Sequence, residues 1–103
     1  MQIYKVFSRF GLTLFMKIED IKISPQFEKH YQKLPKRIKK IAKEKEKIFR
    51  ENPFDSRLGT HKLKGEQKET WAFLITYSYR IKFLFLSSGE VLFLDIGTHD
   101  IYK

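Results

Sequence analysis

The sequence contains no cysteine. Disulfide frameworks, thiolate zinc sites, iron–sulfur clusters and cysteine nucleophiles are therefore excluded, and a reducing cytoplasm is the expected compartment. No apolar run approaches the roughly 20 residues needed to cross a bilayer, so we expect no membrane partner. The first residues lack the early basic cluster and the small-residue cleavage site of a signal peptide. Low-complexity linkers and internal repeats are missing too, so the 103 residues predict a single domain.

Sequence motifs of several large enzyme classes are also missing. There is no G-x-x-x-x-G-K-[ST] for nucleotide phosphates, no G-x-G-x-x-G, no H-E-x-x-H and no G-x-S-x-G. The three histidines, His30, His61 and His99, do not have metal-ligand spacing. We therefore expect no metal and no small-molecule cofactor.

Aromatic residues, by contrast, are abundant. Ten Phe, five Tyr and one Trp contribute to a hydrophobic fraction of 42%. A chain of this size buries roughly 65% of its unfolded surface, which suffices for one core without disulfide or metal. The composition indicates a folded globular domain.

The charge is unevenly distributed. The net charge is +9, and the segment 16–50 alone holds 12 basic and 5 acidic residues, for +7, whereas residues 51–103 are neutral. Such asymmetry indicates a polyanionic or acidic partner, meaning nucleic acid, the ribosome or an acidic protein segment. The simpler alternative is a solvated face of a Lys-rich helix.

The periodicity predicts an α+β fold in the order β-α-α-β-β-β. Ser24-Pro25 predicts a helix start, because Ser caps free N–H groups and Pro suits the first helical position. Pro35 ends that helix, and Asn52-Pro53 ends the next. The expected elements are a strand at 17–23, helices at 24–34 and 35–50, a loop at 54–68, and strands at 70–77, 79–86 and 91–97.

The two helices are expected to pack on one face of a twisted, mainly antiparallel sheet. The second helix has an apolar stripe formed by Ile38, Ile41, Ala42, Ile48 and Phe49. Alternation in the strand at 70–77 is expected to place Trp71, Phe73, Ile75 and Tyr77 on the core side. The opposite face, with Arg80 and Lys82, would be open to a ligand.

Residues able to transfer protons or hold phosphate flank these strands. His61, Lys62 and Lys64 precede the sheet, Arg80 begins a strand, and His99 and Tyr102 follow the last strand. Imidazoles exchange protons near neutral pH, and a guanidinium holds phosphate with two hydrogen bonds. Two proton-transfer groups and an arginine are what metal-free RNA cleavage requires.

Each residue also has a structural interpretation. His61 can be an exposed loop histidine, Arg80 can pair with Asp95, His99 can cap the strand end, and Tyr102 can pack on the sheet. His30, on the first helix, is given no role.

Three segments carry a resemblance to a known family. They are THKLKG (Thr60 to Gly65), WAFLITYSYRIKF (Trp71 to Phe83) and LFLDIGTHDIYK (Leu92 to Lys103). With NPFDSRL (Asn52 to Leu58), they make residues 16–103 resemble the RelE/ParE superfamily of toxin–antitoxin toxins, in particular its YafQ-like mRNA interferases. The resemblance implies two helices on a twisted antiparallel sheet, metal-free cleavage of mRNA in the ribosomal A site, and neutralisation by a cognate antitoxin.

The motifs imply a role for each candidate residue. By this resemblance His61 is the general base, Arg80 stabilises the phosphate, His99 is the general acid, and Tyr102 stacks on or orients a nucleotide. Lys62, Lys64 and Lys82 would contact RNA phosphates.

Two features depart from the family pattern. Ile75 stands where the YafQ-like branch can carry a further histidine, and Tyr102 follows His99 by three residues where relatives often leave four. Residues 1–15 have no counterpart, so we divide the chain into an extension, 1–15, and a toxin domain, 16–103, with Met16 as a candidate translation start. The alternatives to an endoribonuclease are a ParE-like inhibitor of DNA gyrase, which needs no proton-transfer groups, and a generic RNA-binding module.

Overall fold

The computed structural model describes residues 2–8, 11–66 and 69–98. A two-stranded sheet pairs β1 with β2, and a five-stranded sheet has the order β3-β7-β6-β5-β4. The elements are β1 (Gln2–Ser8), β2 (Gly11–Lys17), β3 (Asp20–Ile23), α1 (Pro25–Gln32), α2 (Lys36–Glu51), the 3-10 helix η1 (Ser56–Leu58), β4 (His61–Lys62), β5 (Trp71–Leu74), β6 (Arg80–Ser87) and β7 (Glu90–Gly97).

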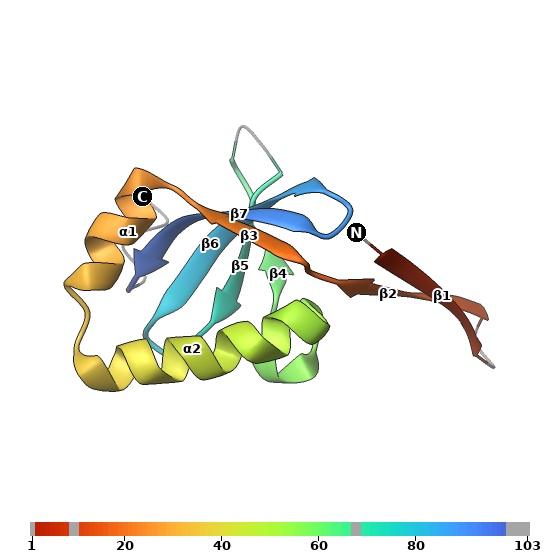
Figure 1. The fold of residues 1–103 in the computed structure, drawn as a ribbon, viewed down its shortest axis with the longest axis horizontal. Helices are drawn as coiled ribbons and strands as arrows, with labels where there is room; N and C mark the ends of the chain where they lie inside the picture. Colours follow the sequence, from red (N-terminus) through yellow and green to blue (C-terminus); the bar gives the residue numbers. More distant parts are fainter. Residues whose placement is uncertain (1, 9–10, 67–68, 99–103) are drawn as a thin grey trace.

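The five-stranded sheet is antiparallel except for the parallel pair of β3 and β7. Helix α2 runs along one face of this sheet, and α1 lies near the end of β7 (Figure 1). The predicted α+β class, the order of the main elements and the placement of two helices on a mainly antiparallel sheet are confirmed.

Helix α1 starts where the sequence predicts it. The Ser24 hydroxyl accepts a hydrogen bond from the Phe27 backbone N–H at 3.0 Å and donates to the Leu94 carbonyl at 2.7 Å. The Ser24 N–H also donates to the Phe93 carbonyl at 3.0 Å. Since β3 ends at Ile23, α1 covers the part of the β7 edge with which β3 does not pair.

The apolar stripe of α2 packs on the sheet as predicted. Ile38, Ala42 and Phe49 are buried, and Ile41 and Ile48 are partly buried against the core. The Phe49 ring lies 4.7 Å from that of Phe73 and 4.9 Å from that of Phe83, and it also contacts Phe93. One side chain thus ties α2 to the three strands β5, β6 and β7.

Two predicted boundaries in the second half are wrong. The expected loop at 54–68 contains η1 and the short strand β4, which pairs with β5. The strand expected to reach Tyr77 ends at Leu74, because the chain then turns, with the Thr76 hydroxyl accepting from the N–H groups of Ser78 and Tyr79. Tyr77 is consequently 90% exposed instead of packed in the core.

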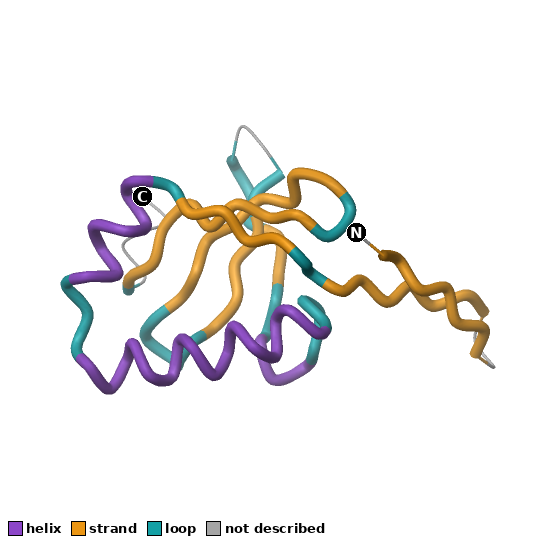
Figure 2. The backbone as a smooth tube through the Cα atoms, viewed as in Figure 1, coloured by secondary structure: helices purple, strands orange, loops and turns teal. Residues whose placement is uncertain are grey.

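The first strands form a hairpin. β1 and β2 pair from Gln2↔Lys17 to Ser8↔Gly11, and the hairpin extends away from the five-stranded sheet (Figures 1 and 2). The predicted division between residues 15 and 16 therefore falls inside β2, and the strand expected at 17–23 begins at Asp20. None of the helices in the described part of the chain has the length and apolar character needed to span a membrane.

Candidate functional site

A row of paired residues crosses the sheet and carries several of the predicted site residues. His61 on β4 pairs with Ala72 on β5, Ala72 pairs with Lys82 on β6, and Lys82 pairs with Asp95 on β7. Directly opposed residues of antiparallel strands share one face of the sheet. Because the neighbours Ile81 and Ile96 are buried in the core, this row lies on the face away from α2. We call this surface the row face.

Arg80 lies one pair farther along the same face. It is opposite Leu74 on one side and Gly97 on the other, and it shares the row face with Lys82 because the two residues are separated by two positions. Its half-buried side chain lines an open hollow of about 420 Å³ together with Tyr77, Ser78 and Thr98. The sheet thus brings Arg80, Lys82 and His61 to one face.

The ring of His61 is exposed and oriented by the backbone. Its Nδ1 lies 3.0 Å from the Gly59 carbonyl oxygen, and since a carbonyl only accepts, Nδ1 carries the hydrogen. Gly59 ends η1 with a φ of 58°, in the left-handed region that favours glycine. In the neutral ring Nε2 is therefore the nitrogen that can take a proton.

Lys82 is less open than the sequence predicts. Its ammonium pairs with Glu66 at 2.6 Å, and the two side chains are only 19% and 28% exposed. Glu66 follows β4, so its carboxylate covers Lys82 on the row face, where Ala72 is fully buried. An incoming phosphate would have to displace the Glu66 carboxylate to reach Lys82.

The other lysines are placed differently. Lys62 pairs with Trp71 in the ladder, on the face opposite to His61, and its ammonium binds Glu69 at 2.8 Å. This hydrogen bond and the ammonium charge lower the pKa of Glu69. Lys64 is exposed in the turn after β4. The sheet therefore does not bring Lys62 together with His61 and Arg80. The two remaining candidates, His99 and Tyr102, lie outside the described residues.

A cluster around Asp95 includes a histidine that the sequence analysis passed over. Asp95 accepts hydrogen bonds from His30 Nδ1 at 2.6 Å, Gln26 Nε2 at 2.7 Å and the Ile96 N–H at 2.8 Å. A carboxylate within the apolar segment LFLDIG was the only sign in the sequence that a polar partner must reach this strand.

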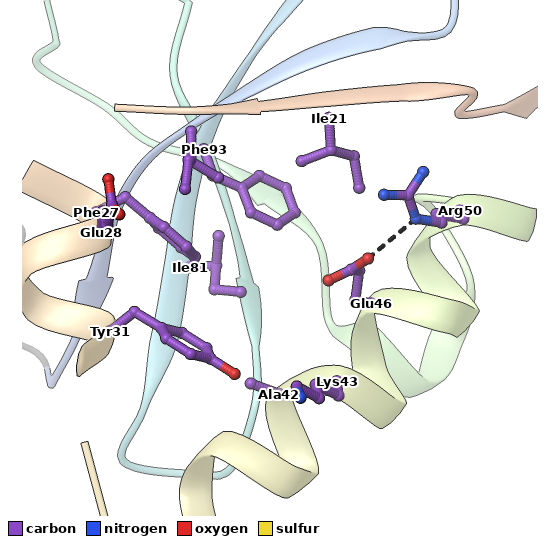
Figure 3. A pocket seen from close by; sticks show the side chains of 11 residues that line it. Ile21, Phe27, Glu28, Tyr31, Ala42, Lys43, Glu46, Arg50, Ile81 and Phe93 are labelled. Carbon is purple, nitrogen blue, oxygen red and sulfur yellow. Dashed lines mark hydrogen bonds and ion pairs between the residues drawn. The ribbon is translucent and has the colours of Figure 1, made fainter. Parts of the chain in front are cut away.

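A second surface feature lies on the helical side. A cavity of about 250 Å³ opens between β3, α1 and α2, with Phe27, Ile81 and Phe93 turned towards one another inside it (Figure 3). The ion pair of Glu46 and Arg50, 3.0 Å long, lies at its rim. We call it the helix groove.

Tyr31 connects the helix groove to a basic hollow on α2, formed with Lys36, Lys39, Lys40 and Lys43. The Lys39 ammonium lies 5.7 Å from the centre of the Tyr31 ring. Burial, followed by the charge of Glu46, raises the pKa of the Tyr31 hydroxyl. An apolar cavity thus continues directly into a strongly basic surface.

Acidic and histidine side chains do not gather into a metal site in residues 2–8, 11–66 and 69–98. No three of them lie close enough to hold an ion. Proton transfer, phosphate binding and protein docking are the chemistry that these surfaces offer.

The fold, unlike the sequence, matches known proteins. No family model and no curated protein sequence matches the chain. A chain of the archaeal RelE–RelB complex from Pyrococcus horikoshii OT3 is 21% identical, with a TM-score of 0.62 over 77% of this chain and 92% of that one. YafQ from E. coli strain BL21(DE3) is 22% identical, with a TM-score of 0.66 over 81% and 96%. A YoeB/ParE toxin from Agrobacterium tumefaciens is 18% identical, with a TM-score of 0.68 over 79% and 99%.

These likenesses concern the fold. The chain has the fold of the RelE, YafQ and YoeB toxins, and the fold expected from the resemblance to the RelE/ParE superfamily is confirmed.

Proposed function

Starting from this shared fold, we propose that the chain is the toxin of a type II toxin–antitoxin system and cleaves mRNA in the ribosomal A site without a metal ion. The observation that carries the proposal is the row face, where an imidazole with a free Nε2 and a guanidinium lie on one side of the sheet. A gyrase inhibitor would need neither group to transfer protons.

The reaction uses the neighbouring 2′-hydroxyl of the RNA as the nucleophile. His61 Nε2 accepts the 2′-hydroxyl proton as the 2′-oxygen forms a bond to phosphorus, and the bond from phosphorus to the 5′-oxygen breaks. The products are a 2′,3′-cyclic phosphate and a 5′-hydroxyl. Arg80 stabilises the charge that develops on the non-bridging phosphate oxygens.

The motif resemblance supplies the remaining roles. His99 donates the proton that the leaving 5′-oxygen requires, and Tyr102 stacks on a nucleotide next to the cleaved bond. Lys62, Lys64 and Lys82 contact flanking phosphates, Lys82 after exchanging Glu66 for a phosphate.

The cognate antitoxin is the protein partner that we propose for the helical side. An amphipathic, acidic segment can place an apolar side chain in the helix groove and its carboxylates on the adjoining lysines of α2. In the RelE–RelB and DinJ–YafQ complexes, one chain shares this fold and is bound to a second protein. Because the attraction is largely between exposed charges, the affinity should fall as salt rises.

Induction of the full chain in cells, with mRNA 5′ ends mapped, tests the enzymatic function. We expect growth arrest with in-frame cuts, lost in His61→Ala and in Arg80→Ala. Arg57→Ala is the matched control, because Arg57 is an exposed arginine of η1 whose guanidinium pairs with Asp55.

The other outcomes are equally informative. Arrest without cuts, unchanged in the His61 and Arg80 variants, would contradict cleavage and favour gyrase inhibition. Cuts that persist in both variants would remove these two residues from the mechanism.

A further inference from the structure

The Asp95 cluster places a third basic group beside the proposed RNA site. The Asp95 side chain is only 8% exposed, and both of its oxygens accept hydrogen bonds. A buried carboxylate requires such donors, and since it only accepts, His30 Nδ1 carries a hydrogen. The His30 side chain remains 40% exposed.

The geometry of α1 explains how His30 reaches this position. Helix α1 lies at the edge of β7 beyond the end of β3, so it can contact both faces of the sheet. Phe27 and Tyr31, four residues apart, pack towards the core. Gln26 and His30, also four residues apart, form the neighbouring stripe and reach Asp95, which lies on the row face.

His30 therefore lies at the far end of the row that begins at His61. Three steps between neighbouring strands separate β4 from β7, a distance of about 14 Å. Successive phosphates along a strand are farther apart than the helical rise of about 3.4 Å, so the row is long enough for about two or three phosphates. Arg80 and Lys82, both cationic, lie between its ends on the same face.

We infer that His30 is a binding residue for the RNA backbone, donating a hydrogen bond from Nε2 to a phosphate that flanks the cleaved one. Asp95 is its positioning residue, because the carboxylate fixes the ring and gives the protonated imidazole an ion-pair partner. This inference rests on the proposed function and adds a subsite to it.

The contact needs a hydrogen on both ring nitrogens, Nδ1 for Asp95 and Nε2 for the phosphate, so the ring that binds RNA is the imidazolium. Asp95 is hydrogen-bonded to this ring, and Lys82, the partner of Asp95 on β6, pairs with Glu66.

Fluorescence anisotropy tests the inference on the full chain. The probe is a labelled 2′-O-methyl oligonucleotide of about ten nucleotides, which binds like RNA but cannot be cleaved because its 2′-hydroxyl is blocked. Affinity is measured as a function of salt concentration at a single, mildly acidic pH. For single strands each phosphate contact contributes about 0.7 to the slope of log K against log salt.

Three variants give distinct expectations. His30→Gln should lower the slope by about 0.7, which is the loss of one phosphate contact. His30→Arg, a permanent cation, should restore the larger slope, which a purely structural role for His30 would not do. Lys47→Gln is the charge-matched control on α2, on the other side of the sheet, and should leave the slope unchanged.

Failure of the inference is distinguishable from failure of the proposed function. If His30→Gln keeps the wild-type slope while Arg80→Ala weakens binding, His30 is not a subsite and the RNA site stands. If the wild type fails to bind at low salt, or Arg80→Ala binds as well as the wild type, both the subsite and the row face as an RNA site are overturned.

Discussion

Replacing Phe49 by alanine should remove the main contact between α2 and the sheet. Phe49 is fully buried, and its ring packs against Phe73, Phe83 and Phe93. Loss of a buried phenyl ring costs about 3–5 kcal/mol, and aromatic contacts add to the loss of buried area. Because the contacting rings belong to three hydrogen-bonded strands, the cavity cannot collapse easily, so we expect about 4 kcal/mol.

That loss is large for a domain of this size, whose total stability is expected to be about 5–15 kcal/mol. It corresponds to a fall in Tm of about 15–30 °C. Urea unfolding followed by far-UV circular dichroism and by the fluorescence of Trp71 measures it. Tyr77→Ala is the control, because Tyr77 is 90% exposed and its removal should change stability by less than about 0.5 kcal/mol.

A loss below about 1.5 kcal/mol for Phe49→Ala would refute this reasoning, since it is less than half the smallest value expected for a buried ring. A loss of equal size for Tyr77→Ala would refute it too, because burial would then not be the cause.

Three further predictions concern single contacts. Ser24→Ala should cost about 1–2 kcal/mol in urea unfolding, because the hydroxyl both caps α1 and bonds a β7 carbonyl, and a loss near zero would contradict that double role. The hydrogen bonds and charge of Arg57 hold the pKa of Asp55 at about 2. The ionised Asp55 carboxylate therefore stabilises the fold fully above its ordinary pKa of 3.8, and this stabilisation is lost as the pH falls towards 2. In an NMR titration Arg57→Gln should move that midpoint back towards 3.8, and an unmoved midpoint would exclude the Arg57 side chain as the cause. Glu66→Gln should make Lys82 react faster with an acylating reagent while the exposed lysines of α2 keep their rates, and an unchanged rate would show that the ion pair does not shield Lys82.

The parts of the fold that follow from local chemistry were predictable from the sequence. Ser24-Pro25 determines where α1 begins through a cap made within three residues. The stripe of Ile38, Ala42 and Phe49 determines which side of α2 is buried. Both signals lie within a few turns of helix and need no knowledge of the rest of the chain.

Features created by tertiary pairing were not predictable in this way. β4 consists of His61 and Lys62, two polar residues without an apolar alternation, and it is a strand only because β5 provides a partner. Tyr77 continues the alternation of β5, but the turn around Thr76 ends the strand first.

The candidate site, too, could be predicted only in part from the sequence. His61, Arg80 and Lys82 could be named from their motifs, but their common face follows from the register of the three strands β4, β5 and β6. His30 and Asp95 are 65 positions apart, and nothing in the sequence indicates that α1 contacts that end of β7.

The pairing of β3 with β7 has a consequence for the order in which the protein forms during synthesis. Contacts such as that of Ser24 with Leu94 join residues 70 positions apart. The long stretch of chain between the two residues must therefore be ordered before such a contact can form. β7 follows every other strand of its sheet in the sequence, yet it is bonded to strands on both sides and holds Asp95. A nascent chain that has not yet added β7 has neither a complete sheet nor a complete row face. The proposed RNA site is therefore completed only when β7 joins the sheet between β3 and β6.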